Sequence, residues 1–304
     1  MRILLTGVSG YLGAELVAPL RAAGHDVRGL ARDPSRVSAD LPVIAGDALT
    51  GEGLDEALDG VDVAYFLIHS MEGSANGFAD RELRIATIFA EAARRAQVRR
   101  VVYLGGLVPQ AAPSVHLASR LAVEDLLLER FPEAVALRAS IVIGARSRSF
   151  RFLVRLLERV PVTPLPSWRD HSTQPVDERD VVAMLVAAAT TQHADGGGVS
   201  LDVAGPDVVT YAGLIDRIRD AMLLGRPQIP LPLSVTPIAA PVAAAIAGED
   251  VGLIRPLMES LGEDLLPRPD RDAASRLGVR THRLDAAIER ALRAWERVEQ
   301  LAAR

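Results

Sequence analysis

Short apolar runs alternate with longer segments of helical periodicity through the first half of the chain. The apolar runs occupy residues 1–5, 26–31, 41–45, 61–68, 101–104 and 135–143. Segments with the helical pattern lie at residues 13–23, 72–97 and 116–130. Strands that alternate with helices are typical of a parallel sheet. Because a strand such as 61–68 is apolar throughout after Asp62, we expect helices on both sheet faces. The pattern predicts an α/β, Rossmann-type fold with a doubly wound parallel sheet.

The second half of the chain is less regular. Residues 161–166 are rich in proline, residues 178–190 have a helical pattern, and residues 198–203 are predicted to form another strand. A final helix is predicted at 284–303. Its apolar stripe consists of Leu284, Ile288, Leu292, Trp295 and Val298. A stripe at this spacing favours packing against the core over binding to a partner.

One uncharged segment, residues 228–248, is long enough to cross a bilayer. Pro230, Pro232, Pro237 and Pro241 interrupt it, and proline breaks a helix interior. Only residues 236–247 are left for a continuous helix, which is too short for a membrane span. We therefore expect a buried helix of a lobe or the wall of an apolar substrate pocket.

The first apolar run ends directly in a glycine-rich turn that opens the first helix. Gly7 allows the tight turn, Gly10 lets the backbone approach a pyrophosphate, and Gly13 lets the helix pack on the strand. The unpaired N–H groups of a helix N-terminus attract phosphate. This order of strand, turn and helix predicts a dinucleotide site. Its residues are Thr6, Gly7, Ser9, Gly10, Tyr11, Leu12 and Gly13.

The end of the second strand bears on which dinucleotide binds. Chains that bind NAD usually carry an acidic residue about 20 residues after the glycines, where it accepts a hydrogen bond from the ribose 2′-hydroxyl. Here Arg32 and Arg36 can hold a 2′-phosphate through charge-assisted hydrogen bonds, and Ser35 adds a hydroxyl. This favours NADP(H). Asp33 is the competing 2′-hydroxyl acceptor, but its place before Pro34 is typical of the cap of a short helix. Alternatively, the two arginines belong to an ordinary solvated turn with no ligand.

Composition narrows the chemistry. The net charge is −5, which gives no electrostatic case for nucleic acid. All 34 basic residues are arginine, so lysine Schiff-base chemistry is excluded, and without cysteine there is no thiolate nucleophile or disulfide. The six histidines show no metal-ligand spacing with carboxylates. Because residue 3 already belongs to the first strand, we expect no signal peptide and a cytoplasmic location.

These segments together resemble the extended and atypical short-chain dehydrogenase/reductases, particularly the NmrA-like NAD(P)H-binding group. The resemblance lies in Thr6–Gly13, Arg32-Asp33-Pro34, Gly46-Asp47-Ala48, Phe66-Leu67-Ile68-His69-Ser70-Met71 and Val102-Tyr103-Leu104-Gly105-Gly106-Leu107. It implies further dinucleotide contacts from Asp47 and Ala48 at the adenine, and from Leu67, His69 and Gly105. His69 would end a strand at the edge where doubly wound sheets bind ligands.

The resemblance also implies how the chain is divided. Residues 1–150 would form the NAD(P)-binding body, which the chain rejoins at about 172–206, where Thr173-Gln174-Pro175-Val176 and Ala204-Gly205-Pro206-Asp207 resemble the family. Residues 151–171 and 207–304 would form a smaller, mostly helical substrate lobe and the C-terminal helix. Within this lobe we expect Leu231, Val235 and Ile238 to lie near a substrate cavity.

The sequence departs from the family where the chemistry usually occurs. The family uses a Tyr-x-x-x-Lys pair, and this chain has His116-Leu117-Ala118-Ser119-Arg120 instead, with Gly105 and Gly106 at the usual serine position. A spacing of four still places His116 and Arg120 on one helix face. Arg120 can bind the nicotinamide ribose, and His116 can act as general acid or base, with the arginine favouring its neutral form. Alternatively, His116 is a surface residue at a helix start.

Two functions fit these residues. The first is an NADPH-dependent reductase of a small apolar activated acceptor, such as an enone, quinone or imine, whose reduction needs less help from a protein acid. The second is a non-catalytic NAD(P)H-binding redox sensor or regulatory module. A sugar-nucleotide epimerase fits less well because that chemistry relies on the absent Tyr and Lys. We expect a monomer or homodimer.

Overall fold

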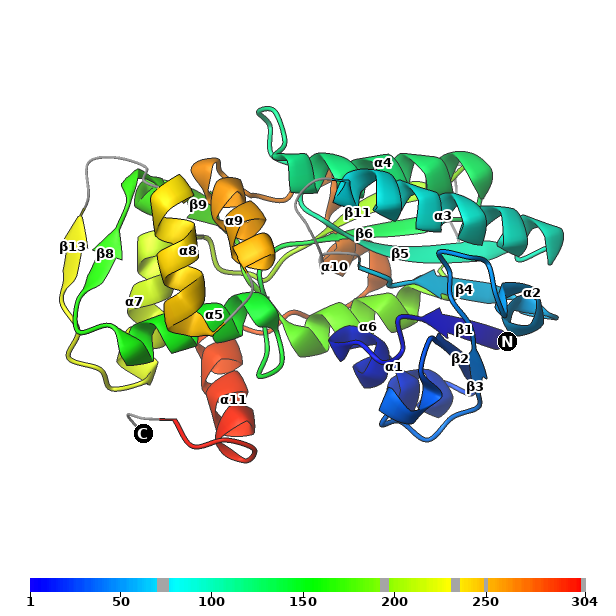
Figure 1. Ribbon diagram of the computed structural model, residues 1–304, viewed down its shortest axis with the longest axis horizontal. Coiled ribbons are helices and arrows are strands. Elements are labelled where there is room, and N and C mark those ends of the chain that lie inside the picture. Colours follow the sequence, from blue (N-terminus) through cyan, green and yellow to red (C-terminus); the bar gives the residue numbers. More distant parts are fainter. Residues whose placement is uncertain (70–76, 192–196, 231–235, 249–250, 302–304) are drawn as a thin grey trace.

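A parallel seven-stranded sheet forms the centre of the computed structural model (Figure 1). The structure describes residues 1–69, 77–191, 197–230, 236–248 and 251–301. The strand order is β11-β6-β5-β4-β1-β2-β3, and every neighbouring pair is parallel. The strands are β1 (Arg2–Thr6), β2 (Asp26–Ala31), β3 (Val43–Ala45), β4 (Val63–Phe66), β5 (Arg100–Gly106), β6 (Val135–Ala139) and β11 (Val199–Val203).

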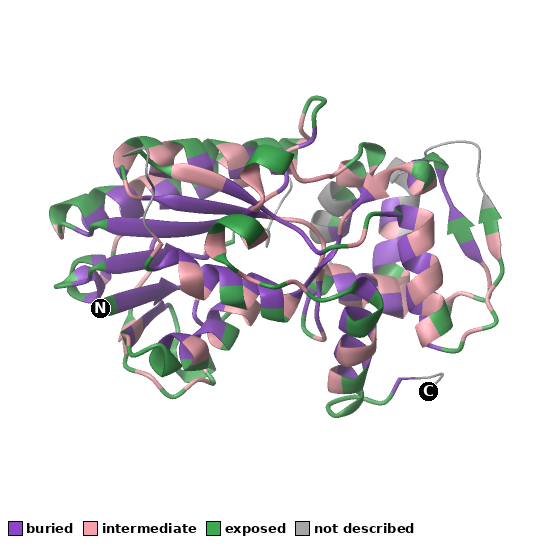
Figure 2. Ribbon diagram, turned by 180° about the vertical axis from the view of Figure 1, so that it is seen from behind, coloured by how far each residue is buried: buried purple, intermediate pink, exposed green. Residues whose placement is uncertain are grey.

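Helices cover both faces of the sheet, which confirms the doubly wound Rossmann-type fold (Figure 1). On one face lie α1 (Tyr11–Ala22), α6 (Glu178–Ala188) and α10 (Ala273–Leu277). The other face packs against α2 (Leu54–Leu58), α3 (Phe78–Arg95) and α4 (Val115–Arg130). Figure 2 shows the strands buried almost throughout, as a two-sided sheet requires.

A second group of helices packs around its own apolar core beyond the sheet. It consists of α5 (Arg148–Arg159), α7 (Tyr211–Ala221), α8 (Thr236–Ala247), α9 (Val251–Glu259) and α11 (Leu284–Glu296). Short strands and 3-10 turns connect these helices. They are β7 (Val142–Ile143), β8 (Thr163–Leu165), η2 (Ser167–Asp170), β9 (Ser172–Thr173), β10 (Val176–Asp177), β12 (Val209–Thr210), β13 (Gln228–Pro230), η3 (Ser260–Gly262) and η4 (Pro269–Arg271).

Several predicted boundaries are wrong. The run 135–143 is not one strand, because it breaks after Ala139 and continues as β7, which pairs with β10 outside the main sheet. The helix predicted at 72–97 begins at Phe78, and residues 70–76 lie outside the described chain. Helices α2 and α5 were not predicted, although the apolar and arginine residues of α5 alternate at helical spacing.

The final helix is shorter than predicted, because it ends at Glu296 instead of residue 303. Four members of its apolar stripe are buried, but Val298 is 88% exposed beyond the helix end. The uncharged segment contains α8, whose bounds Thr236–Ala247 are those left by the prolines. Among the residues that the structure describes, no helix has the length and apolar character needed to cross a bilayer.

Candidate functional site

The glycine-rich turn between β1 and α1 has the geometry expected for binding a dinucleotide. Gly7 has a φ of +71°, and its carbonyl accepts a hydrogen bond from the Gly10 N–H at 2.9 Å. A Cβ at Gly7 would lie 2.7 Å from the Leu67 carbonyl oxygen, and a Cβ at Gly13 would collide with the Gly7 oxygen. Ser9 and Gly10 are exposed, and no side chain caps the start of α1. The first-turn N–H groups therefore form a cradle that fits a pyrophosphate.

Thr6 and Leu67 hold the neighbouring strands together. The Thr6 hydroxyl donates to the Tyr65 carbonyl at 2.7 Å and accepts from the Leu67 N–H at 3.3 Å. Thr6 is buried, and both hydrogen bonds of its hydroxyl connect β1 to the end of β4. Leu12, also predicted to bind the cofactor, packs against the core on the α1 side of the sheet. The cofactor contacts of these residues stay predictions.

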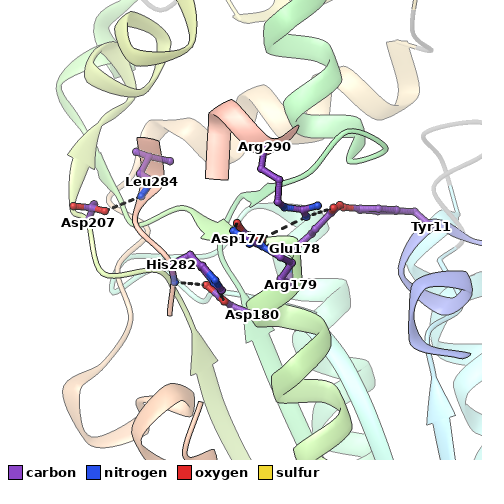
Figure 3. A network of polar contacts seen from close by, with 9 residues as sticks. All are labelled: Tyr11, Asp177, Glu178, Arg179, Asp180, Asp207, His282, Leu284 and Arg290. Carbon is purple, nitrogen blue, oxygen red and sulfur yellow. Dashed lines mark hydrogen bonds and ion pairs between the residues drawn. The ribbon is translucent and has the colours of Figure 1, made fainter. Parts of the chain in front are cut away.

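Tyr11 points away from the glycine turn toward the second group of helices (Figure 3). Its hydroxyl donates to the Glu178 carboxylate at the start of α6, and Arg290 of α11 contacts the same carboxylate. A Cβ at Gly144 would collide with both the Tyr11 hydroxyl and Glu178, so only glycine leaves room for this contact. Burial, followed by the charge of Glu178, raises the pKa of Tyr11 above its usual value, which keeps the phenol protonated.

The turn after β2 exposes Arg32, Ser35 and Arg36, the residues predicted to bind a 2′-phosphate. Asp33 caps the 3-10 turn η1 (Pro34–Arg36), as predicted, by accepting from the Ser35 N–H at 3.0 Å. The Ser35 hydroxyl also donates to Asp33, at 2.6 Å. This hydroxyl bond lowers the pKa of Asp33, so a carboxylate stands beside the two arginines.

Asp47 and Ala48, predicted to lie at the adenine, form a tight turn after β3. The Asp47 carboxylate accepts from the Leu49 N–H at 2.9 Å, and the Asp47 N–H donates to the Glu52 carbonyl at 3.0 Å. Ala48 is buried in the core. The turn therefore has a fixed shape, and its contact with adenine stays a prediction.

A buried polar cluster lies beyond the carboxyl ends of β4 and β5. Arg120 of α4 is only 4% exposed, and its guanidinium donates to the Leu104 carbonyl and contacts His69. It also lies 3.6 Å from Glu82 of α3, which is 2% exposed and 3.9 Å from the His69 Nδ1. The Ser119 hydroxyl donates to the other Glu82 oxygen at 2.7 Å.

Glu82 neutralises the charge that Arg120 brings into this cluster. Burial raises the pKa of Glu82, but its contacts with His69, Arg120 and Ser119 outweigh burial and lower that pKa to about 2. Sequence analysis missed this residue. Glu82 could have been found from its spacing, because it lies three residues before Ile85 and seven before Phe89, on the apolar stripe that α3 buries. A carboxylate buried at such a position needs a cation beside it.

His116 lies on the first turn of α4, with its ring centroid 6.3 Å from that of Phe78. Burial, followed by the charge of Arg120, lowers the pKa of His116 to about 4. This is the direction predicted from the neighbouring arginine. At neutral pH the imidazole is therefore uncharged and can donate one N–H hydrogen bond.

Tyr103 and Gly105 of β5 face the core. The Tyr103 hydroxyl donates to the Arg120 carbonyl at 3.1 Å, and burial raises its pKa. A Cβ at Gly105 would lie 3.1 Å from the Tyr103 ring, so this glycine faces the core instead of an open site. Within the described residues, no group of three or more His, Asp or Glu side chains is placed to hold a metal ion.

An apolar cavity of about 300 Å³ lies between the sheet and the second group of helices. Gly106 and Ala139, which end β5 and β6, line it together with His116, and Ser140 lies beside them. The helices contribute a wall of aliphatic and aromatic side chains, among them Phe152, Leu156, Trp168, Leu214, Ala243, Ile246 and Met258. The site therefore combines one neutral imidazole with a large apolar surface. Leu231 and Val235, which we expected near this cavity, lie outside the described residues, as does the side chain of Ile238.

The comparison with protein families agrees with the glycine turn. A family model described as NAD(P)H-binding matches residues 7–139, which is less than half of the chain. An uncharacterized protein of Mycobacterium tuberculosis is 29% identical over 233 residues, or 76% of this chain and 24% of that protein. The chain therefore spans about a quarter of the length of that relative.

Two further relatives cover most of the chain. The mitochondrial NADH dehydrogenase (ubiquinone) 1 alpha subcomplex subunit 9 of Arabidopsis thaliana is 28% identical over 254 residues, which is 78% of this chain and 61% of that protein. The structure of MoeE5 in complex with UDP-glucose and NAD superposes with a TM-score of 0.71 at 21% identity, covering 98% of this chain and 99% of the other. Residues 7–139 are thus similar to an NAD(P)H-binding family, and the likeness to the solved structure shows that the whole chain shares its fold.

Proposed function

We propose that the chain is an NADPH-dependent reductase of a small apolar activated acceptor, such as an enone, a quinone or an imine. The observation that carries this proposal is the apolar cavity, with His116 on its wall beside the ends of β5 and β6. Ligands of doubly wound sheets bind beyond the carboxyl ends of the strands. A cavity lined mainly by aliphatic and aromatic side chains favours an apolar ligand.

The chain's own residues supply the cofactor site in this proposal. The first turn of α1 would hold the pyrophosphate, and the turn at Asp47 would lie against the adenine. Arg32 and Arg36 would hold the 2′-phosphate of NADPH, against the nearby charge of Asp33. When bound, the reduced nicotinamide supplies a hydride, and the acceptor takes up one proton as well.

His116 acts in this proposal as a neutral hydrogen-bond donor. Its pKa of about 4 leaves almost no imidazolium at neutral pH, so it cannot serve as a strong acid there. A neutral imidazole can still polarise the oxygen or nitrogen of an acceptor. An enone, quinone or imine is already electrophilic, and an unactivated ketone would need the stronger help that this site lacks.

Arg120 has two roles in the proposal. Its positive charge adds to the effect of burial in lowering the pKa of His116, while Glu82 offsets that charge inside the protein. We predicted that Arg120 also holds the nicotinamide ribose. One terminal nitrogen contacts His69 and the other donates to the Leu104 carbonyl, so a ribose hydroxyl would accept from one of the remaining N–H groups of the guanidinium.

A non-catalytic redox sensor is the second candidate. Two observations favour it: no free Tyr and Lys pair serves the cavity, and one relative is a subunit of a larger assembly. In this reading the polar cluster would fix the bound dinucleotide without reacting. A cytoplasmic location, membership of the NmrA-like group and a monomeric or homodimeric state remain proposals with either function.

One experiment separates the two functions. NADPH is added to the protein with a panel of quinones, enones and imines, and oxidation is followed by absorbance, with saturated ketones of matched size as controls. A reductase should oxidise NADPH with at least one activated acceptor and much more slowly with the matched ketone. If NADPH binds at micromolar concentration and no acceptor is reduced, the sensor is supported and the reductase is rejected.

A further inference from the structure

The last helix reaches the dinucleotide turn through three side chains (Figure 3). Arg290 of α11 contacts the Glu178 carboxylate, and the other Glu178 oxygen accepts from the Tyr11 hydroxyl. Tyr11 is the first residue of α1 and follows Gly10 of the glycine turn. Residues separated by 279 positions in the chain are thus joined by two successive contacts.

The network is partly buried. The Glu178 side chain is 13% exposed, and Arg290 also lies 3.5 Å from the Asp177 carboxylate, whose side chain is fully buried. Arg290 therefore serves two carboxylates at the start of α6. Asp177 is held in turn by Arg179 at 2.7 Å. A buried carboxylate that loses its cation is strongly destabilised, so these groups are expected to move together.

Tyr11 connects this network to the first turn of α1. The N–H groups of the first turn of α1 are the donors that face a pyrophosphate, and their aim depends on where this turn sits. We propose that Glu178 and Arg290 are positioning residues for the dinucleotide, which hold the first turn of α1 through the Tyr11 hydroxyl. The C-terminal helix then contributes to cofactor affinity without touching the cofactor.

The proposal implies coupling in both directions. If α11 docking raises cofactor affinity, the bound cofactor must stabilise α11 docking by the same factor. This inference rests on dinucleotide binding alone. It therefore holds for a reductase and for a sensor, and failure to find an acceptor would leave it intact.

The test measures dissociation constants of NADPH and NADH from nucleotide fluorescence for Tyr11→Phe, Arg290→Gln and the double variant. Each single variant should weaken binding of both nucleotides by about fivefold, because each breaks the same chain of contacts. The double variant should be no weaker than the worse single variant. Independent losses that multiply in the double variant would overturn the proposal.

Arg293→Gln is the matched control. Arg293 lies on the same helix, its side chain is 69% exposed, and it forms an ion pair with Glu289 one turn away. It should leave the affinity unchanged, and an equal loss there would contradict the proposal. Hydrogen exchange gives an independent measurement should Arg290→Gln fail to fold. Saturating NADPH should slow amide exchange in α11 of the native chain and not in Tyr11→Phe, and equal slowing in both would reject the coupling.

Discussion

The buried ion pair of Glu82 and Arg120 decides what the residues around it can do. Two charges that are almost fully removed from water cost several kcal/mol each unless they compensate one another. Arg120 stands where the family that the sequence resembles has a lysine. It is a permanent cation, and Glu82 of α3 forms an ion pair with it. Burial, followed by the charge of Arg120, disfavours protonation of His116, so the histidine beside this pair is a neutral donor and not a charged acid.

Replacing Glu82 with Gln should destabilise the fold by about 3–5 kcal/mol at pH 7, because it leaves Arg120 buried without an anion. The pKa of Glu82 falls from 4.5 to about 2 on folding, so its stabilisation is present above pH 4.5 and is lost as pH falls toward 2. Urea unfolding at pH 7 and pH 3 should show a difference between variant and native chain that shrinks at pH 3. Glu91→Gln, on an exposed position of the same helix, should change little at either pH.

The pH dependence of turnover should report the neutral state of His116. Because the pKa of His116 is about 4, the imidazole stays neutral throughout pH 5 to 8, and kcat should stay flat over this range. His116→Phe should lower kcat by about tenfold, the effect of one lost hydrogen bond. A profile that rises on acidification through pH 6.5, or a loss near a thousandfold, would show a charged general acid instead.

Most elements of the Rossmann half followed from the sequence pattern, whereas in the other half α8 and the start of α11 were predicted and α5 was not. The glycine turn, β2 and α4 were predictable because fully buried strands and capped helices repeat a local signal. The break after Ala139 was not predicted, because residues 135–143 are mostly apolar on both sides of the point where the chain leaves the sheet toward the cavity. The role of Glu82 could not be predicted from local pattern either, because its partner Arg120 lies 38 residues away on another helix.

The turn after β2 should set the choice between the two nucleotides. Arg32→Ala should reduce the preference for NADPH over NADH by about tenfold, since one charge-assisted contact contributes about 1.5–3 kcal/mol. Binding titrations of both nucleotides measure this. Arg84→Ala removes the same charge from an exposed position on α3 and should leave the ratio unaltered. Equal affinity of the native chain for both nucleotides would contradict NADP(H) selectivity.

At the scale of the whole molecule, an apolar cavity of about 300 Å³ lies where the sheet meets the second group of helices. The uncharged segment that resembles a membrane span in composition instead supplies α8, and Ala243 and Ile246 of this helix line the cavity. The apolar residues of this segment thus line a cavity inside the protein. The reaction that we propose depends on this surface, because the polar cluster alone would not select an apolar acceptor.

Filling the cavity should separate acceptor binding from cofactor binding. Ala243 is 9% exposed on α8 and lines the cavity, so Ala243→Phe should raise KM for a bicyclic quinone by about tenfold or more through overpacking. The NADPH dissociation constant should stay within about twofold, because no residue of the glycine turn lines the cavity. Ala245→Phe, two residues further on the same helix and exposed, controls for the change in helix composition. An acceptor KM that Ala243→Phe leaves unaltered would place the substrate outside this cavity.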